Sequence, residues 1–407
     1  MTCSLQLTLI AGIFAVTTVV VSRGMQLPYA VSISSVLIAV TVKLSPVQFI
    51  ILVGQTLANR STLELIVAVV LIRWLGDLMN RSGSLSRSSE FLRQIVGDLR
   101  VVAAVIPMLV GALMVPGGAI LSAPSVEQLT DDIGFQPSKQ AAVNLIFRHI
   151  GQICLPMSAA LIMLASITGV SLARQALFQL PIAIGIGLFS FLFYFSSVKP
   201  DTKKVMNKEN GLSVLKNLIM ELSPILVILV LFTLTQKIAW ALVLGMIWAF
   251  GQYRLSVKEL LSSFPLNDSI KSILLVIGIL TIRSILQNEV MTEAFAMPLL
   301  PGYLTPAIVA FLPWIVGFFT GSVLAAASLV APLLLPLVNT GTGAHFFCAA
   351  IFMGAFGGYL VSPIHLCLSL TSEYYHVPLN RIYRSIWAPA AAFSVSAVIS
   401  GILFTIS

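Results

Sequence analysis

Long apolar runs alternate with short polar segments along the whole chain. A helix needs roughly 20 apolar residues to cross a bilayer, so this pattern predicts a series of membrane-spanning helices. The expected spans are residues 5–21, 27–42, 61–80, 138–169, 171–197, 214–234, 237–253, 267–287, 343–373 and 379–405. Amphipathic segments at 81–100 and 288–300 predict helices at the membrane surface, and the shorter stretch 46–59 predicts an interfacial or partly inserted helix.

Two apolar stretches contain too many helix breakers for a simple span. Residues 107–124 hold three prolines and three glycines in eighteen positions, and residues 313–332 begin and end with proline. Backbone that leaves the helix inside a bilayer must be buried in protein or line a wet cavity, because lipid offers it no hydrogen bonds. We therefore expect two re-entrant hairpins, at about 104–137 and 306–341, whose tips meet at a substrate site near the membrane midplane.

Residues recur at a nearly constant offset between the two halves of the chain. At an offset of 206 or 207, the matched pairs include Pro107 and Pro313, Gly111 and Gly317, Ser122 and Ser328, Pro156 and Pro363, and Leu172 and Leu379. The pattern predicts a first repeat at 1–197, a polar linker at 198–213 and a second repeat at 214–407. Each repeat has five spans and a hairpin, and its broken helix lies at about 138–169 or 343–373. An odd number of crossings inverts one repeat relative to the other.

Composition and charge fix the class and the expected orientation. The 407 residues are 58% hydrophobic and 9% charged, against about 25% charged residues in soluble proteins, so we expect an all-α polytopic membrane protein. The net charge of +8 lies in short loops, which indicates orientation and not a nucleic-acid partner. With both termini outside the inner membrane and linker 198–213 in the cytoplasm, the inner segments hold most of the basic residues, among them Arg23, Arg81, Arg87, Lys199, Lys203, Lys204, Arg381 and Arg384.

A polar stripe follows one face of the first broken helix. Gln140, Asn144, Arg148 and Gln152 are four residues apart, which places them on one helix face. One interpretation is that the stripe lines the transport path and that Arg148 attracts an anion. The alternative is that the stripe joins helices through hydrogen bonds, with Arg148 reaching the inner surface. For the adjacent His149, a packing role is expected.

The second broken helix has a similar stripe that includes Ser362, His365 and Ser369. Gly357, Gly358 and Pro363 predict that this helix unwinds around 357–363. One interpretation is that the His365 imidazole, beside unwound backbone, binds substrate or relays protons. The alternative is a buried histidine that donates to a freed carbonyl.

The hairpin tips offer bare backbone and hydroxyl groups. Gly117 and Gly118 are expected to bind substrate in the first hairpin, whereas Ser122, Gly321, Ser322 and Ser328 are expected to hold a coupling ion. Helix N-termini favour anions and freed carbonyls favour sodium. Close packing of helices through small residues is the alternative. The cysteines Cys3, Cys154, Cys348 and Cys367 lack metal-type spacing, so no metal site is expected.

Three passages carry a family resemblance: PGGAILSAP at 116–124, VNLIFRH at 143–149 and LVSPIHLCLSLTSEYY at 360–375. Together they resemble domain-of-unknown-function family 401, a family of integral membrane proteins, over nearly the whole chain. The resemblance implies membership of the ion transporter superfamily, alongside gluconate, citrate, dicarboxylate and arsenite carriers. It also implies a fold with two inverted repeats, each with a re-entrant hairpin and a broken helix.

The sequence therefore predicts a secondary active transporter of a small anion that works by alternating access. Few acidic residues lie within the spans, so sodium is favoured over protons as the coupling ion, and no other cofactor is expected. The expected partners are the anion and membrane lipid, with a homodimer as the assembly. An uncoupled channel or exporter is the alternative. An enzyme that uses His365, Ser369 or Arg148 is a third possibility, but the metalloprotease, Walker A and serine-hydrolase motifs are absent.

Overall fold

A computed structural model of the chain describes residues 3–23, 25–112, 119–131, 133–199, 211–254, 256–286, 304–337, 342–363 and 365–407. Over these residues the chain is helical and contains no strand. Within the described part of the chain, four helices are long and apolar enough to cross a membrane: Leu172–Phe195, Gly211–Thr235, Gly343–Leu360 and Leu379–Ile406. Several shorter apolar helices accompany them. This is the all-α architecture of a polytopic membrane protein that the hydrophobic pattern predicts.

The helices of the first half follow the predicted segments closely. They are α1 (Cys3–Ser22), α2 (Leu27–Thr41), α3 (Pro46–Ala58), α4 (Arg60–Arg81), α5 (Ser84–Ile95), α6 (Leu99–Ala112), α7 (Ala119–Asp131), α8 (Pro137–Ile150), α9 (Ala159–Thr168) and α10 (Leu172–Phe195). The predicted break near Pro156 is the non-helical segment 151–158 between α8 and α9.

The second half has the same order of helices. They are α11 (Gly211–Thr235), α12 (Ile238–Gln252), α13 (Val257–Ser262), α14 (Leu266–Leu286), α16 (Thr305–Thr320), α17 (Val323–Leu334), a 3-10 turn at Leu335–Leu337, α18 (Thr342–Leu360), α19 (Leu366–Tyr374) and α20 (Leu379–Ile406). The sequence did not predict α13, which starts with a capping box between Ser256 and Glu259. The amphipathic segment 288–300 lies outside the described residues.

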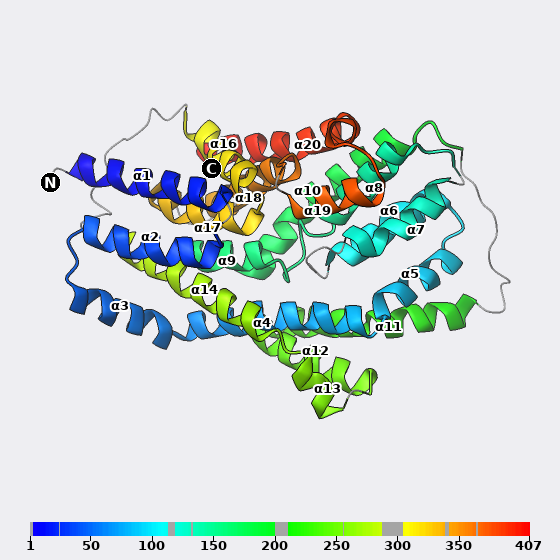
Figure 1. Ribbon diagram of the computed structural model, residues 1–407, viewed down its shortest axis with the longest axis horizontal. Helices are drawn as coiled ribbons and strands as arrows, with labels where there is room; N and C mark the ends of the chain where they lie inside the picture. Colours follow the sequence, from blue (N-terminus) through cyan, green and yellow to red (C-terminus); the bar gives the residue numbers. More distant parts are fainter. Residues whose placement is uncertain are drawn as a thin grey trace.

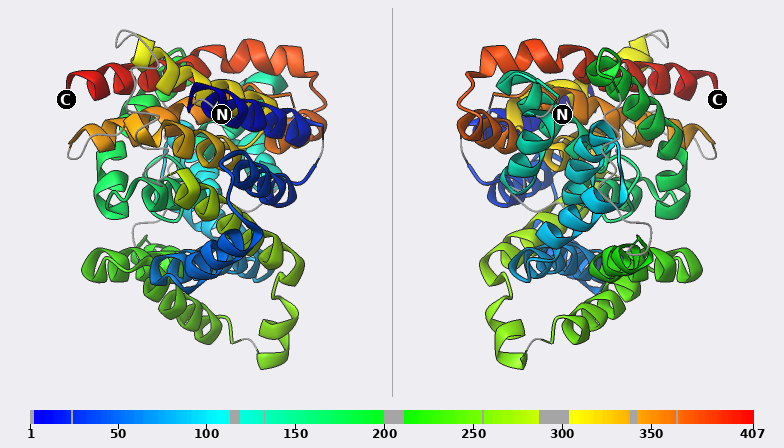
Figure 2. Two further views of the ribbon diagram at one scale, coloured as in Figure 1. Left: turned by 90° about the vertical axis from the view of Figure 1, so that its left-hand side faces the viewer. Right: turned by 90° about the vertical axis from the view of Figure 1, so that its right-hand side faces the viewer.

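The helices form two groups (Figure 1). We call α2–α5 with α11–α14 the lower group, and α6–α10 with α16–α20 the upper group, as oriented in Figure 1. Within the lower group α2 packs on α14, α4 on α12 and α5 on α11, whereas within the upper group α6 packs on α8 and α18 packs on α16 and α20. Figure 2 shows α13 projecting from the lower group, on the side away from the upper group. Contacts such as those of α9 with α4 and of α17 with α14 join the two groups.

Close packing of α6 on α8 depends on two glycines. A Cβ atom at Gly111 would lie 2.0 Å from the carbonyl oxygen of Arg148, and one at Gly151 would lie 2.6 Å from that of Met108. Real side chains do not approach backbone oxygens this closely, so only glycine permits the contact. The carbonyl end of α8, which carries Arg148, is therefore held directly against α6.

The same contact recurs between α16 and α18. A Cβ atom at Gly317 would lie 2.4 Å from the carbonyl oxygen of Ala355, and one at Gly358 would lie 1.9 Å from that of Trp314. Each of these four residues follows its counterpart in the first half by 206 or 207 positions. The repeat noticed in the sequence thus corresponds to a repeated helix contact.

The glycine pair of α18 does not unwind the helix, contrary to the sequence prediction for 357–363. Helix α18 continues to Leu360, the described residues 361–363 and 365 are not helical, and α19 begins at Leu366. Gly357 and Gly358 lie within the helix because α16 packs against their bare backbone; a Cβ atom at either would meet Trp314 within 3.0 Å. The pair therefore serves close packing.

Several helices of the first half pack against helices of the second half. Helix α17 packs on α9, whereas its counterpart α7 packs on α19; likewise α2 packs on α14 and α4 on α12. Such crossed pairs are expected of two similar units related by a two-fold axis. The direction of that axis relative to the membrane, and thus the inversion of one repeat, stays a prediction.

Candidate functional site

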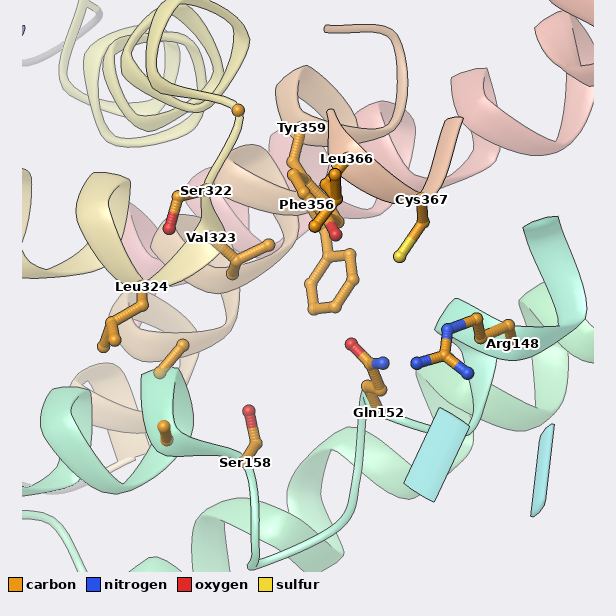
Figure 3. Close-up of a pocket in the computed structure, with 13 residues that line it drawn as sticks. Arg148, Gln152, Ser158, Ser322, Val323, Leu324, Phe356, Tyr359, Leu366 and Cys367 are labelled. Carbon is orange, nitrogen blue, oxygen red and sulfur yellow. The ribbon is translucent and has the colours of Figure 1, made fainter. Parts of the chain in front are cut away.

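A cavity of about 270 Å³ lies where the chain interruptions of the upper group meet (Figure 3). It is bounded by the break between α8 and α9, the tip of the hairpin formed by α16 and α17, and the region around the break between α18 and α19. Its lining residues are Arg148, Gln152, Ser158, Ala159, Ala160, Gly321, Ser322, Val323, Leu324, Phe356, Tyr359, Leu366 and Cys367. No carboxylate side chain belongs to this described lining.

Three helices present their first two residues to the cavity. These pairs are Ala159 and Ala160 of α9, Val323 and Leu324 of α17, and Leu366 and Cys367 of α19. A helix N-terminus carries partial positive charge and free N–H groups. The cavity therefore lies at a point where three such ends converge.

Serine caps two of these helix ends. The Ser158 hydroxyl accepts a hydrogen bond from the Leu161 N–H at 3.4 Å, and the Ser322 hydroxyl accepts one from the Ala325 N–H at 3.1 Å. The hairpin turns at Gly321, whose φ of +58° is left-handed backbone that suits glycine. His365 occupies the cap position of α19 and makes no capping hydrogen bond.

Arg148 and Gln152 provide polar side chains to the cavity. Arg148 is 1% exposed at the end of α8, and Figure 3 shows its guanidinium directed toward Gln152, below Phe356 and Cys367. The Gln152 amide donates to the Gly111 carbonyl at 3.1 Å. A buried cation beside three helix N-termini makes the cavity strongly favourable for negative charge.

Two residues of the polar stripe on α8 join helices, as one interpretation proposed, and the other two line the cavity, as the other proposed. The Gln140 amide donates to Asp131 at 2.6 Å; Asn144 accepts from the Ser122 hydroxyl at 2.6 Å and donates to the Ala119 carbonyl at 2.9 Å. These two stripe residues join α8 to α7, whereas Arg148 and Gln152 line the cavity. The N-terminal part of this helix face thus packs against α7, and its C-terminal part lines the cavity.

Substitutions in the two parts of the stripe should separate stability from binding. Asn144→Leu leaves the buried Ser122 hydroxyl without its acceptor, so we expect the unfolding free energy to fall by about 1–3 kcal/mol, with little change in anion affinity. Gln152→Leu should weaken anion binding by about 5- to 10-fold, as expected for loss of one hydrogen bond. Thermal melts and ligand titrations of both variants measure the two effects. Equal effects of both substitutions on affinity would contradict the division.

The other predicted site residues differ in whether they line the cavity and in whether they are buried. Gly321 and Ser322 line the cavity. Ser328 is buried on α17 and its hydroxyl has no hydrogen-bond partner among the described residues. The Ser362 hydroxyl donates to the Phe318 carbonyl at 2.6 Å, whereas Ser369 is exposed and bonds to its own helix at the His365 carbonyl. Ser369 therefore lies away from the cavity, and Gly117 and Gly118 lie outside the described residues.

His149 and His365 come together behind the cavity wall. Their ring centroids are 4.9 Å apart, and the Tyr359 ring lies 3.7 Å from that of His365. Both histidines are 0% exposed, and Tyr359 is partly buried. The sequence placed the two histidines on separate segments, and their contact arises from the packing of α8 on α19.

Sequence reasoning missed Ser158, Phe356, Tyr359 and Cys367 as lining residues. The repeat contains a signal for two of them. Ser158 precedes His365 by 207 positions, and Gln152 precedes Tyr359 by the same number, which is the offset of the repeat. Ser158 and His365 are the cap residues of α9 and α19, and Gln152 and Tyr359 both line the cavity.

Comparisons with known proteins agree with this architecture. A family model described as "Protein of unknown function (DUF401)" matches residues 4–406. No curated protein matches the chain. A crystal structure of the Alcanivorax borkumensis YdaH transporter, described as having an unusual topology, is similar with a TM-score of 0.63 and 13% sequence identity. The similarity covers 89% of each chain and concerns the fold.

Proposed function

The chain belongs to the DUF401 family, and we propose that it is a secondary active transporter of a small anionic solute. The observation that carries this proposal is the cavity where Arg148 and the N-termini of α9, α17 and α19 converge. The similar fold of a protein described as a transporter supports the same class. A volume of about 270 Å³ lies just below the roughly 300–1,000 Å³ of drug-sized ligand sites, which favours a small solute.

We further propose that the two repeats are inverted and that the helix pairs α6–α7 and α16–α17 are re-entrant hairpins. The repeated glycine contacts and the crossed helix pairs support a two-fold relation. The division into an upper and a lower group supports alternating access, in which the upper group carries the cavity and shifts against the lower group. Both termini then lie outside the inner membrane and linker 198–213 is cytoplasmic.

Sodium is the coupling ion that we propose. Hydroxyl and carbonyl oxygens are available at the second hairpin, where Ser328 is buried with no hydrogen-bond partner among the described residues. The described cavity lining lacks carboxylates that could relay a proton. The Ser122 hydroxyl already donates to Asn144, so Ser328, Gly321 and Ser322 are the stronger candidates.

Membrane lipid and a second copy of the chain are the remaining proposed partners. Apolar side chains are exposed on α3 and α12, among them Ile50, Ile51, Trp240 and Ile247. Such faces suit either acyl chains or a homodimer formed through the lower group.

Ligand-dependent melting tests the proposed substrate class and ion. A ligand that binds only the folded state stabilises it by RT ln(1 + [L]/Kd), about 2.7 kcal/mol at 100 times Kd. We expect a small organic acid to raise the melting temperature more in sodium than in potassium buffer. Uptake into proteoliposomes should then follow an imposed sodium gradient. Uptake that ignores both sodium and proton gradients would favour an uncoupled channel and contradict the proposal.

A further inference from the structure

Three potential metal ligands meet at the wall of the cavity. A ring nitrogen of His149, a ring nitrogen of His365 and the Cys367 sulfur lie within 4.8 Å of one another, and all three residues are buried. His149 comes from α8 of the first half, whereas His365 is the cap residue of α19 in the second half and Cys367 is the second residue of that helix. The cluster is therefore created by tertiary packing, which is why the spacing of the cysteines gave no sign of it.

His149 is already oriented as a ligand. Its Nδ1 lies 2.6 Å from the Leu145 carbonyl, and because a carbonyl only accepts, Nδ1 carries the proton. The neutral ring then has its lone pair on Nε2, which is 3.4 Å from the Tyr359 hydroxyl. A histidine that binds a metal usually donates its other N–H to a carbonyl in this way.

His365 has unsatisfied ring nitrogens. The residue is 0% exposed, and neither Nδ1 nor Nε2 has a hydrogen-bond partner among the described residues. Buried polar atoms without partners are costly and rare, and a ligand bound to the ring would remove the cost.

We propose that His149, His365 and Cys367 bind one soft monovalent cation of the Cu(I) class. Thiolate and imidazole ligands suit both copper and zinc. Arg148 adjoins His149 in α8 and lines the same cavity as Cys367, and its positive charge selects between the two metals. With one thiolate, Cu(I) gives a neutral complex, whereas Zn²⁺ leaves a net positive charge buried beside the guanidinium.

The binding step balances with the release of one proton. The Cys367 S–H bond breaks and a metal–sulfur bond forms, while two neutral imidazoles add their lone pairs; the proton goes to solvent. Bonds of about 2.0–2.3 Å in a trigonal plane hold ligand atoms roughly 3.6 Å apart. The three ligand atoms lie within 4.8 Å of one another, so binding requires them to approach by about 1 Å. The cation would then be part of the cavity wall, because Cys367 lines the cavity.

Copper titration of the purified full-length protein under anaerobic conditions tests the proposal. In competition with a chromogenic Cu(I) chelator, the unmodified protein should hold one equivalent more than Cys367→Ser or His365→Gln. Cys154→Ser is the matched control, because Cys154 lies outside the cluster, and it should hold as much as the unmodified protein. Zn²⁺ should bind the cluster at least tenfold more weakly than Cu(I).

Two titration results would overturn the proposal. One is an equal number of Cu(I) equivalents in the unmodified protein and in Cys367→Ser; the other is Zn²⁺ binding to the cluster that is less than tenfold weaker than Cu(I) binding. X-ray absorption at the copper edge of the unmodified protein decides the matter even if the variants fold poorly. One sulfur and two nitrogen neighbours are expected, and a shell of sulfur alone would contradict the assignment.

Discussion

Replacing Arg148 by methionine should weaken binding of the anionic substrate by roughly 10- to 100-fold. A hydrogen bond to a charged group contributes about 1.5–3 kcal/mol, and Arg148 is the charged residue in the described cavity lining. Methionine keeps much of the side-chain length and loses the charge and the donors. Titration of the purified protein with the best-stabilising organic acid measures the change, and the melting temperature of the ligand-free protein reports whether the variant folds.

Two further variants make this result interpretable. Arg148→Lys keeps the charge and loses the planar donor geometry, so it should restore part of the affinity. Arg174→Met removes an exposed arginine at the start of α10 and should leave affinity unchanged. If Arg148→Met binds the acid as tightly as Arg174→Met does, the cavity is not the anion site.

The sequence predicted the helices well because each has a local signal. The apolar runs locate the spans, and Pro156 and Pro363 locate the breaks between α8 and α9 and between α18 and α19. The short helix α13 was missed because six residues are too few to establish a hydrophobic period. The role of Gly358 was also missed, since a glycine that breaks a helix and a glycine that packs against another helix look alike in sequence.

The candidate site was predictable only in part. Arg148 and Gln152 stood out because polar residues are rare in the spans, but nothing local distinguished them from Asn144, which packs against α7. Pairs such as His149 with His365 depend on how two distant segments meet. Helix periodicity predicts which face of a helix carries a residue, but it does not predict which other helix packs against that face.

The second large effect is expected from Gly111→Ala, because this glycine connects helix packing to the site. The added methyl group would lie 2.0 Å from the Arg148 carbonyl oxygen and 3.1 Å from its Cα. Backbone cannot move aside as a flexible side chain does, so α6 and α8 must separate. Overpacking of this kind costs about 1–3 kcal/mol, and the displaced end of α8 carries Arg148 away from the cavity. We therefore expect a lower melting temperature together with a loss of anion affinity.

Two further variants, Gly317→Ala and Gly185→Ala, distinguish the loss of stability from the loss of anion affinity. Gly317 makes the equivalent contact with Ala355, so its substitution should lower the melting temperature similarly and reduce affinity less, because Ala355 does not line the cavity. Gly185 lies within α10 with no atom within 4 Å of an added Cβ, and alanine there should be neutral or stabilise the helix by up to about 1 kcal/mol. A Gly111→Ala protein that melts and binds like Gly185→Ala would show that α6 and α8 do not pack through bare backbone. The position assigned to Arg148 depends on that contact and would then be wrong as well.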